Sequence, residues 1–127
     1  MQNRVTYEFA IIRLVPKVER EEFLNIGVVL FSKRKKYLGI KYTLDEKKIN
    51  SFANKVDTIR IHKYLKAWEL ICKGKPDGGS IGQLEQASRF RWLTASKSTI
   101  IQCSPTHPGR CHDPQKILEE IFKLYVL

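Results

Sequence analysis

The sequence predicts an α+β fold in which a mainly antiparallel sheet of about four strands packs against helices, in the order β-β-β-α-α-α-β-α. Three observations lead to this class. Segments rich in β-branched and aromatic residues occupy the first third of the chain, helix-capping patterns follow them, and Asp113-Pro114 precedes a closing amphipathic segment. The 127 residues show no internal repeat and no linker-like stretch, so we interpret residues 1–127 as a single domain.

The first two predicted strands are expected at the centre of the sheet. Val5 to Val15 (VTYEFAIIRLV) and Leu24 to Phe31 (LNIGVVLF) are apolar on both faces, which is typical of strands buried on both sides. Gly27 in the second run indicates a bulge or a close approach of another segment. Tyr37 to Tyr42 alternates in polarity instead, and we expect it to form an edge strand.

Four consecutive basic residues, Lys33 to Lys36 (KRKK), fall at the predicted turn between the second and third strands. Two interpretations stay open for them. Charges beside an edge strand prevent it from pairing with other chains. The same charges would also attract an anionic ligand.

Capping patterns predict two helices after the third strand. Thr43 and Glu46 form a capping box for a helix over roughly residues 44 to 54. Asp57 caps a longer helix that extends to about Lys73. One face of that helix carries an apolar stripe, made of Ile61, Leu65, Trp68 and Cys72.

A third helix and a fourth strand are expected next. Ser80 and Gln83 form another capping box, which predicts a helix from about Ile81 to Phe90. Thr99 to Cys103 has the composition of a strand, and the prolines and glycine of residues 105–109 predict a loop.

The final helix is predicted from its start signal. Asp113 suits the N-cap, and a proline suits the first helical position, so the helix should run from about Pro114 to Tyr125.

The charge balance favours anionic partners. With 23 Lys and Arg against 13 Asp and Glu, the net charge is +10, and such a field attracts nucleic acid, a nucleotide or an acidic protein. Solvated lysines that only keep a small protein soluble are the alternative. Most of the surplus precedes residue 77, where 17 of the basic and 8 of the acidic residues lie.

Cellular location is inferred from what the sequence lacks. No stretch approaches the ~20 apolar residues that span a bilayer, and Met1 runs into a strand pattern without a signal-peptide core. We therefore expect a cytoplasmic protein without a membrane segment. The three cysteines form no even-numbered disulfide framework, so free thiols are expected.

The segment from Arg89 to Asp113 holds the most varied polar chemistry. Its cationic side chains, Arg89 among them, suit phosphate or carboxylate, and its hydroxyls add neutral donors. The alternative is an ordinary loop in which hydroxyls cap turns and arginines pair with nearby glutamates. The predicted ligand-binding residues are Arg91, Thr94, Lys97, Ser98, Thr99, Ser104, His107 and Arg110.

The same segment contains residue types that bind zinc or act as thiol nucleophiles. Cys103, His107, Cys111 and His112 are zinc-type ligands, but their spacing lacks the paired elements of structural zinc sites, so no metal and no cofactor is expected. A cysteine nucleophile would need His107 or His112 as its base, and no family-specific signature surrounds either cysteine. Phosphate-loop, dinucleotide, HExxH and GxSxG motifs are missing as well.

Two blocks of the sequence carry a family resemblance. They are YEFAIIRLVPKVEREEFLNIGVVLF and RFRWLTASKSTIIQCSPTHPG, the second followed by Asp113-Pro114 before a helix. Together they resemble the bacterial family catalogued as domain of unknown function 3037. The resemblance implies no reaction, but members are often encoded beside a protein similar to HipA-type kinases, which implies an accessory role to a HipA-like kinase in a toxin-antitoxin-like locus. The residues that match the second block are Arg91, Trp92, Thr94, Ser98, Thr99, Ser104, His107, Gly109 and Asp113.

Three functional hypotheses follow. The leading one is a non-catalytic anion-binding or partner-binding module for a nucleotide, a nucleic-acid backbone or an acidic protein segment. The first alternative is a metal-independent phosphoesterase or nuclease-like enzyme, with His107 as general acid or base and Arg91 or Lys97 stabilising developing charge. The second is a structural protein–protein interaction domain whose basic helix docks onto a kinase-like partner through Lys63 and Lys66.

Overall fold

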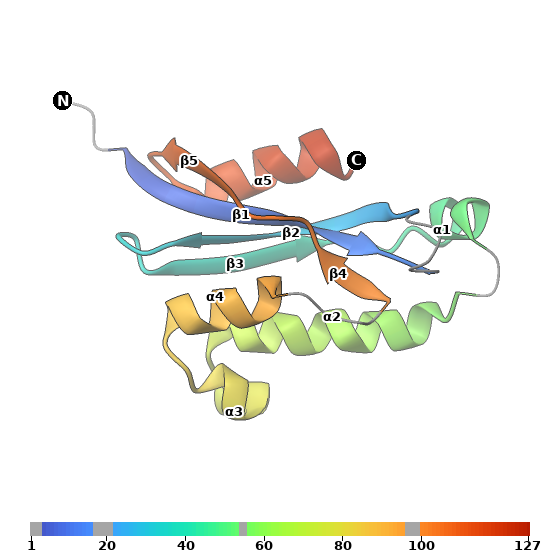
Figure 1. Ribbon diagram of the computed structural model, residues 1–127, viewed down its shortest axis with the longest axis horizontal. Helices are drawn as coiled ribbons and strands as arrows, with labels where there is room; N and C mark the ends of the chain where they lie inside the picture. Colours follow the sequence, from blue (N-terminus) through green and yellow to red (C-terminus); the bar gives the residue numbers. More distant parts are fainter. Residues whose placement is uncertain (1–3, 17–21, 54–55, 96–99) are drawn as a thin grey trace.

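The computed structural model describes residues 4–16, 22–53, 56–95 and 100–127. It confirms the predicted α+β class, with an antiparallel sheet covered by helices on both faces (Figure 1). Within these residues the sheet has five strands: β1 (Val5–Leu14), β2 (Leu24–Ser32), β3 (Tyr37–Tyr42), β4 (Ile101–Cys103) and β5 (His107–Cys111). The helical elements are α1 (Glu46–Phe52), α2 (Thr58–Lys73), the 3₁₀ turn Pro76–Gly78, α3 (Gly79–Gly82), α4 (Gln86–Thr94) and α5 (Pro114–Tyr125).

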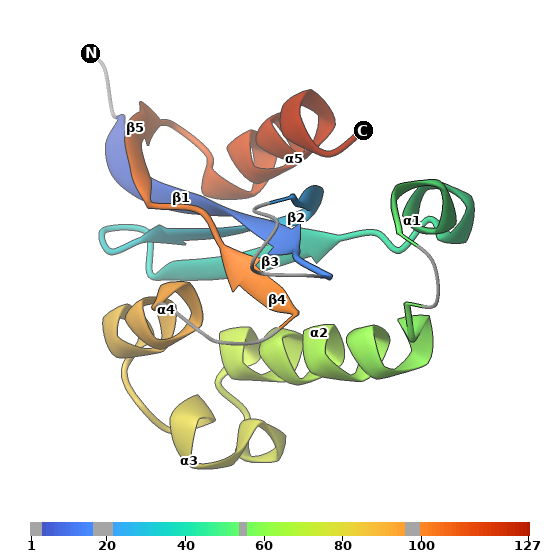
Figure 2. The ribbon, with the colours of Figure 1, turned by 45° about the vertical axis from the view of Figure 1, so that its right-hand side comes forward.

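β1 lies at the centre of the sheet, as its two-sided apolar pattern predicts. One of its edges pairs with β2, which in turn pairs with β3, so β3 is the predicted edge strand. The other edge of β1 pairs with β5 along the first half of the strand and with β4 along the second half, and both run beside β1 in Figure 2. Ser104 joins these two pairings, because its backbone N–H donates to the Ile11 carbonyl at 2.8 Å.

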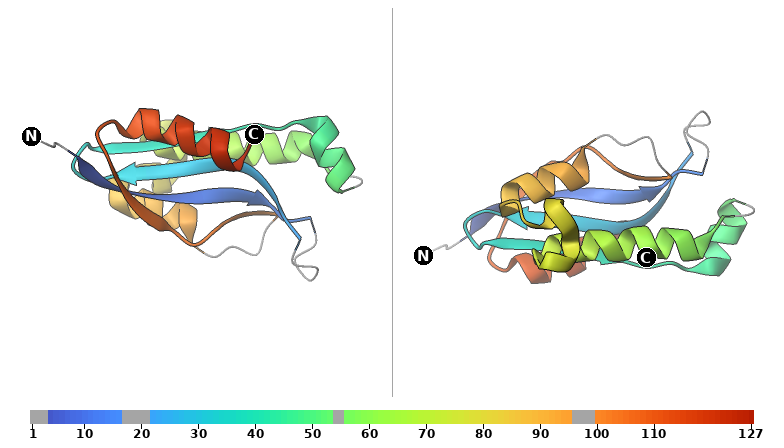
Figure 3. Two further views of the ribbon diagram at one scale, coloured as in Figure 1. Left: turned by 90° about the horizontal axis from the view of Figure 1, so that it is seen from above. Right: turned by 90° about the horizontal axis from the view of Figure 1, so that it is seen from below.

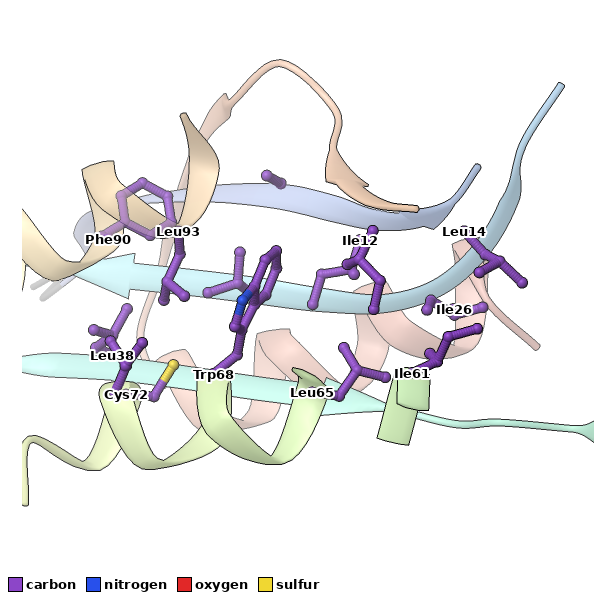
Figure 4. Close-up of a cluster of buried hydrophobic side chains, with 14 of the residues drawn as sticks. Ile12, Leu14, Ile26, Leu38, Ile61, Leu65, Trp68, Cys72, Phe90 and Leu93 are labelled. Carbon is purple, nitrogen blue, oxygen red and sulfur yellow. The ribbon is translucent and has the colours of Figure 1, made fainter. Parts of the chain in front are cut away.

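Two apolar layers hold the helices on the sheet. α2 and α4 cover one face and α5 covers the other, as Figure 3 shows from above and below. The predicted stripe of α2 is buried against the first face (Figure 4) and consists of Ile61, Leu65, Trp68 and Cys72. On the second face, α5 buries Leu118, Ile121 and Phe122 over Val28 and Leu30 of β2. Burial of this apolar surface provides the main stabilisation.

Gly27 confirms the expected bulge and close approach. The register between β1 and β2 shifts at Ile12/Arg13, where Gly27 is the partner of Ile12. A Cβ at Gly27 would lie 2.8 Å from the Lys41 carbonyl oxygen of β3. Only glycine therefore lets the two strands pair here without a shift.

The first helix begins later than the capping box at Thr43 predicts, so that box is wrong. Thr43 directly follows β3, and its N–H still donates to the Ile26 carbonyl of β2 at 2.9 Å. Asp45 is the N-cap instead and accepts from the Lys48 N–H at 3.2 Å. The caps at Asp57 and Asp113 are as predicted, and α5 has the predicted bounds.

The helix predicted over residues 81–90 is also wrong. A single turn, Gly79–Gly82, is followed by a separate helix from Gln86 to Thr94. The turn ends at Gly82, and Glu85 is extended with a ψ of 159° as the N-cap of the second helix, so the predicted helical run is interrupted between Gly82 and Gln86.

β5 corrects the prediction of a loop over residues 105–109. His107–Cys111 pairs with β1 from Phe9 to Val5. Pro108 is compatible with this strand because β1 is its only neighbour in the described sheet, and prolines are confined to such edges. Gly109 is required for another reason, since a Cβ there would overlap the Tyr7 ring.

Candidate functional site

A pocket of about 190 Å³ lies between α4 and the sheet. It draws residues from β1, β2 and α4 and from the connection between β4 and β5. Its lining residues are Glu8, Phe31, Ala87, Phe90, Arg91, Thr94 and Thr106. Two of the predicted site residues, Arg91 and Thr94, are therefore brought together in one concavity.

α4 supplies one wall of the pocket by helical spacing. Ala87, Phe90, Arg91 and Thr94 recur at intervals of three or four residues, which places them on one face of the helix. The Phe90 ring stacks on Phe31 of β2 with centroids 5.4 Å apart, and this pair forms an apolar wall. The Thr94 hydroxyl donates to the Phe90 carbonyl at 2.9 Å, so its oxygen lone pairs remain as acceptors.

Arg89 fixes α4 in place and does not belong to the site. Its guanidinium donates to the carbonyls of Ile71 and Cys72 at 2.8 and 2.9 Å and to the Leu84 carbonyl at 2.9 Å. These carbonyls include the end of α2, where a cation is favourable. The side chain is buried, so the expectation that Arg89 binds an anionic ligand is wrong.

Glu8 is the acidic member of the pocket. It lies on β1 opposite Phe31 of β2 and Pro108 of β5, and it is exposed. Within the described ranges, no ion pair joins Glu8 to Arg91. The pocket thus presents a carboxylate and a guanidinium that are both open to a ligand.

Arg110 flanks the pocket on the sheet side. It pairs with Thr6 on β1, two residues before Glu8. Because side chains two residues apart on a strand share a face, Arg110 lies on the same face as Glu8. It is exposed.

His107 lies on the other face of the sheet. It is the strand partner of Phe9, whose ring belongs to the layer under α5, and the two ring centroids are 5.4 Å apart. Adjacent residues on β1 alternate between faces, so Phe9 and Glu8 point in opposite directions. The structure therefore separates His107 from Arg91.

Ser104 has a structural position. It is 2% exposed, its Oγ accepts from the Ile11 N–H at 2.8 Å, and its hydroxyl donates to the Pro105 carbonyl at 2.9 Å. Both functions of the hydroxyl are used inside the protein, which corrects its prediction as a ligand-binding residue. Lys97, Ser98 and Thr99 lie outside the described residues.

A basic surface adjoins the pocket at one end of the sheet. Gln86 at the start of α4 donates from Nε2 to the Lys36 carbonyl at 2.9 Å, which holds the tip of the β2–β3 hairpin beside the helix. The antiparallel register places the start of β1 and the end of β5 at the same end (Figure 1). We call the exposed cations of these segments the basic end: Arg4, Lys33, Arg34, Lys35, Lys36, Arg91 and Arg110.

Two of the three cysteines, Cys72 and Cys111, have the environment of structural residues. Burial raises the pKa of the Cys72 thiol to about 12. Burial, and then the charge of Asp113, also raises the pKa of Cys111. Nucleophilic and metal-binding cysteines have the opposite shift, and the described residues hold no group of three or more His, Cys, Asp or Glu that could bind a metal ion.

Sequence reasoning missed Glu8 and Thr106. Glu8 is an acid within a strand of apolar residues, TYEFAII, and that contrast was the available signal. Its importance depends on α4, which is about 80 residues away in the chain, so no local pattern identifies it.

In the described part of the chain, no helix is long and apolar enough to cross a membrane.

Comparison with known proteins identifies one family. A family model with the description "Protein of unknown function (DUF3037)" matches residues 9–126, which is nearly the whole chain. No curated protein and no solved structure matches the chain.

Proposed function

The chain belongs to the DUF3037 family, whose description assigns no activity, and we propose that it is a non-catalytic module that binds the phosphate backbone of a nucleic acid. The observation that carries this proposal is the basic end, where exposed cations from four chain segments meet beside a pocket.

The basic end has the composition of a phosphate-binding surface. Arginine presents a planar fork of donors that fits two phosphate oxygens, and lysine adds point charge. The hairpin carries four such cations in succession, and α4 and β5 add Arg91 and Arg110. The net charge of +10 adds a long-range attraction for polyanions.

A nucleic acid explains the mixed pocket better than an acidic protein segment does. The carboxylates of an acidic segment would be attracted by Arg91 and Arg110 but repelled by the exposed carboxylate of Glu8 on the same face of the sheet. A nucleic acid offers anionic phosphates for the arginines and hydrogen-bond donors on its bases for the carboxylate. Both kinds of side chain then have a partner.

Binding is supported over phosphoester hydrolysis by the position of His107. A general acid or base must reach the same phosphate that the cation stabilises. His107 lies on the face of the sheet opposite the face that carries Arg91, so the two cannot act on one phosphate in this arrangement.

The alternative of an interaction domain rests on α2. Three of its cations are engaged within the helix, because Lys66 and Lys73 bind Glu69 at 3.4 and 3.3 Å, and Arg60 lies over the Tyr64 ring. Lys63 is exposed and remains its main candidate contact. Mixing with a HipA-like kinase tests this role, since Lys63→Glu should then weaken complex formation.

The experiment is a titration of the protein against a fluorescent ten-nucleotide uridine oligomer, followed by anisotropy. The affinity should fall steeply between roughly 50 and 200 mM salt, because each neutralised phosphate of a single strand contributes about 0.7 to the slope of log K against log salt. The double variant Lys33→Glu/Lys35→Glu should lose about 10-fold or more in affinity.

The matched control is Lys47→Glu/Lys63→Glu, which changes the net charge equally. Both residues are exposed on α1 and α2, away from the hairpin. Equal losses in the two double variants would show that only net charge matters. That result, salt-independent binding, or binding of polyglutamate without binding of the oligomer would each overturn the proposal.

A further inference from the structure

We propose that the pocket under α4 holds one unpaired guanine of a single-stranded nucleic acid, with the Glu8 carboxylate accepting hydrogen bonds from its N1–H and N2 amino groups. This inference rests on the proposed binding of a phosphate backbone at the basic end. It adds a base preference, which backbone contacts cannot supply.

The size of the pocket limits what it holds. Its volume of about 190 Å³ is below the roughly 300–1,000 Å³ of pockets that enclose drug-sized ligands. A single planar base is a smaller object than these ligands. The wall formed by Phe31 and Phe90 is apolar, as surfaces that contact the rings of bases are.

Glu8 determines which base edge fits. An ionised carboxylate only accepts hydrogen bonds, and it has two oxygens side by side. Guanine presents two adjacent donors on its Watson–Crick edge, N1–H and the N2 amino group. Adenine and cytosine place a ring-nitrogen acceptor beside their amino group, and uracil places a carbonyl on each side of its N–H, so each of these edges sets an acceptor against the second carboxylate oxygen.

The nucleotides on either side of the bound guanine lie next to cationic side chains. Arg91 lies in the pocket wall on α4, and Arg110 lies on β5 on the same face as Glu8. Gln86 holds the hairpin cations at the start of the same helix that lines the pocket. A base in this pocket therefore has its flanking phosphates within a basic surface.

The ligand must be single-stranded at this point. The edge that Glu8 would bind is occupied by the opposite strand in a duplex, and flipping a paired base out requires a few kcal/mol. A base in a single strand exposes its Watson–Crick edge without this flipping energy.

The test compares three ten-nucleotide oligomers in the anisotropy assay. Each is uridine except for one central position, which holds guanosine, inosine or adenosine; inosine lacks the N2 amino group. We expect guanosine to bind about 10-fold more tightly than adenosine, within the range of a bidentate contact, and inosine to lie between them.

Two variants link the preference to the pocket. Glu8→Gln keeps the shape of the side chain but replaces one acceptor with a donor, and it should abolish the guanosine preference, so that the guanosine and adenosine oligomers bind with equal affinity. Ala87→Met fills the pocket from α4 and should remove the preference as well. Thermal melting of both variants checks that they are folded.

The outcomes separate the two proposals. If the wild-type protein binds these three oligomers and the all-uridine oligomer equally and with a steep salt dependence, the guanine pocket is wrong and backbone binding stands. If guanosine is preferred and Glu8→Gln retains the preference, the assignment of Glu8 is wrong. If none of the oligomers binds, the proposed function itself fails.

Discussion

Gln86 joins α4 to the basic hairpin through a hydrogen bond from its Nε2 to the Lys36 carbonyl at 2.9 Å. Lys36 has a φ of 51°, in the left-handed region that side chains other than glycine seldom adopt. The hairpin tip also has an internal bond, from the Lys36 N–H to the Lys33 carbonyl at 3.1 Å. The orientation of the hairpin cations relative to the pocket therefore depends on Gln86.

The first prediction concerns this link. Gln86→Ala should lower the free energy of unfolding by about 1 kcal/mol, because one hydrogen bond to a strained turn is lost. Hydrogen exchange should become faster at residues 33–36. Oligomer affinity should fall by less than in Lys33→Glu/Lys35→Glu, since all the charges remain.

Gln83→Ala is the control, because Gln83 is exposed and lies in the turn before α4. Equal exchange rates of the hairpin in Gln86→Ala and in the wild-type protein would show that the bond does not order the turn.

The second prediction separates two neighbouring arginines of α4. Arg89→Met should lower the free energy of unfolding by about 3 kcal/mol, because three hydrogen bonds from a buried guanidinium are lost and the carbonyls of Ile71 and Cys72 lose their donor. Arg91→Met should change it by less than about 0.5 kcal/mol, as is usual at exposed positions. Urea denaturation measures both values.

The two variants should have the opposite ranking in oligomer affinity. Under conditions where both variants are folded, Arg91→Met should weaken oligomer binding and Arg89→Met should not. A loss of binding in folded Arg89→Met that matches Arg91→Met would contradict the assignment of these two residues.

The sequence was sufficient for elements whose signals are local. The apolar runs of β1 and β2, the alternation of β3 and the caps Asp57 and Asp113 are all properties of a short window, and each is confirmed. The capping box at Thr43 was misleading because the Thr43 N–H pairs with the Ile26 carbonyl at the end of β3. The box at Ser80 was misleading because the helical turn there ends at Gly82.

Non-local pairing explains what the sequence could not supply. β5 contains a proline and a glycine, which are turn residues locally, and it becomes a strand only because β1 offers an unpaired edge. The pocket likewise joins Glu8 to Arg91, which no sequence window contains. His107 looked equivalent to Arg91 in the sequence, and strand alternation alone decides that they lie on opposite faces.

The third prediction concerns Ser104. Ser104→Ala leaves the buried N–H of Ile11 without its 2.8 Å acceptor, so the free energy of unfolding should fall by about 1–3 kcal/mol. Oligomer affinity of the folded variant should equal that of the wild-type protein, because Ser104 is 2% exposed and its hydroxyl is bonded inside the protein. A variant of unchanged stability with weakened binding would instead place Ser104 in the ligand site.

The last prediction links Tyr42 of β3 to Glu69 of α2 through pH. The Tyr42 hydroxyl donates to Glu69 Oε1 at 2.9 Å. This bond, followed by the bonds from Lys73 and Lys66, lowers the pKa of Glu69. Burial and then the bond to Glu69 raise the pKa of Tyr42 to about 12.

The direction of the pH dependence follows from these shifts. A carboxyl whose pKa is lowered by folding stabilises the protein above its unfolded pKa of about 4.3, and this contribution disappears as the pH falls through the folded pKa. A tyrosine whose pKa is raised contributes stability that is complete below pH about 10 and is lost as the pH rises toward about 12. The free energy of unfolding should therefore decline at both low and high pH, and the Tyr42–Glu69 pair should contribute to both declines.

Tyr42→Phe tests the pair. The variant should lose about 1 kcal/mol of the free energy of unfolding at neutral pH, because the hydroxyl donor is gone. Its stability should also fall less steeply than that of the wild-type protein below pH about 4.5 and above pH about 10, since one titrating tyrosine and the main cause of the Glu69 shift are removed. Urea denaturation across this range measures the slopes, and parallel curves for the two proteins would show that the pair does not couple folding to pH.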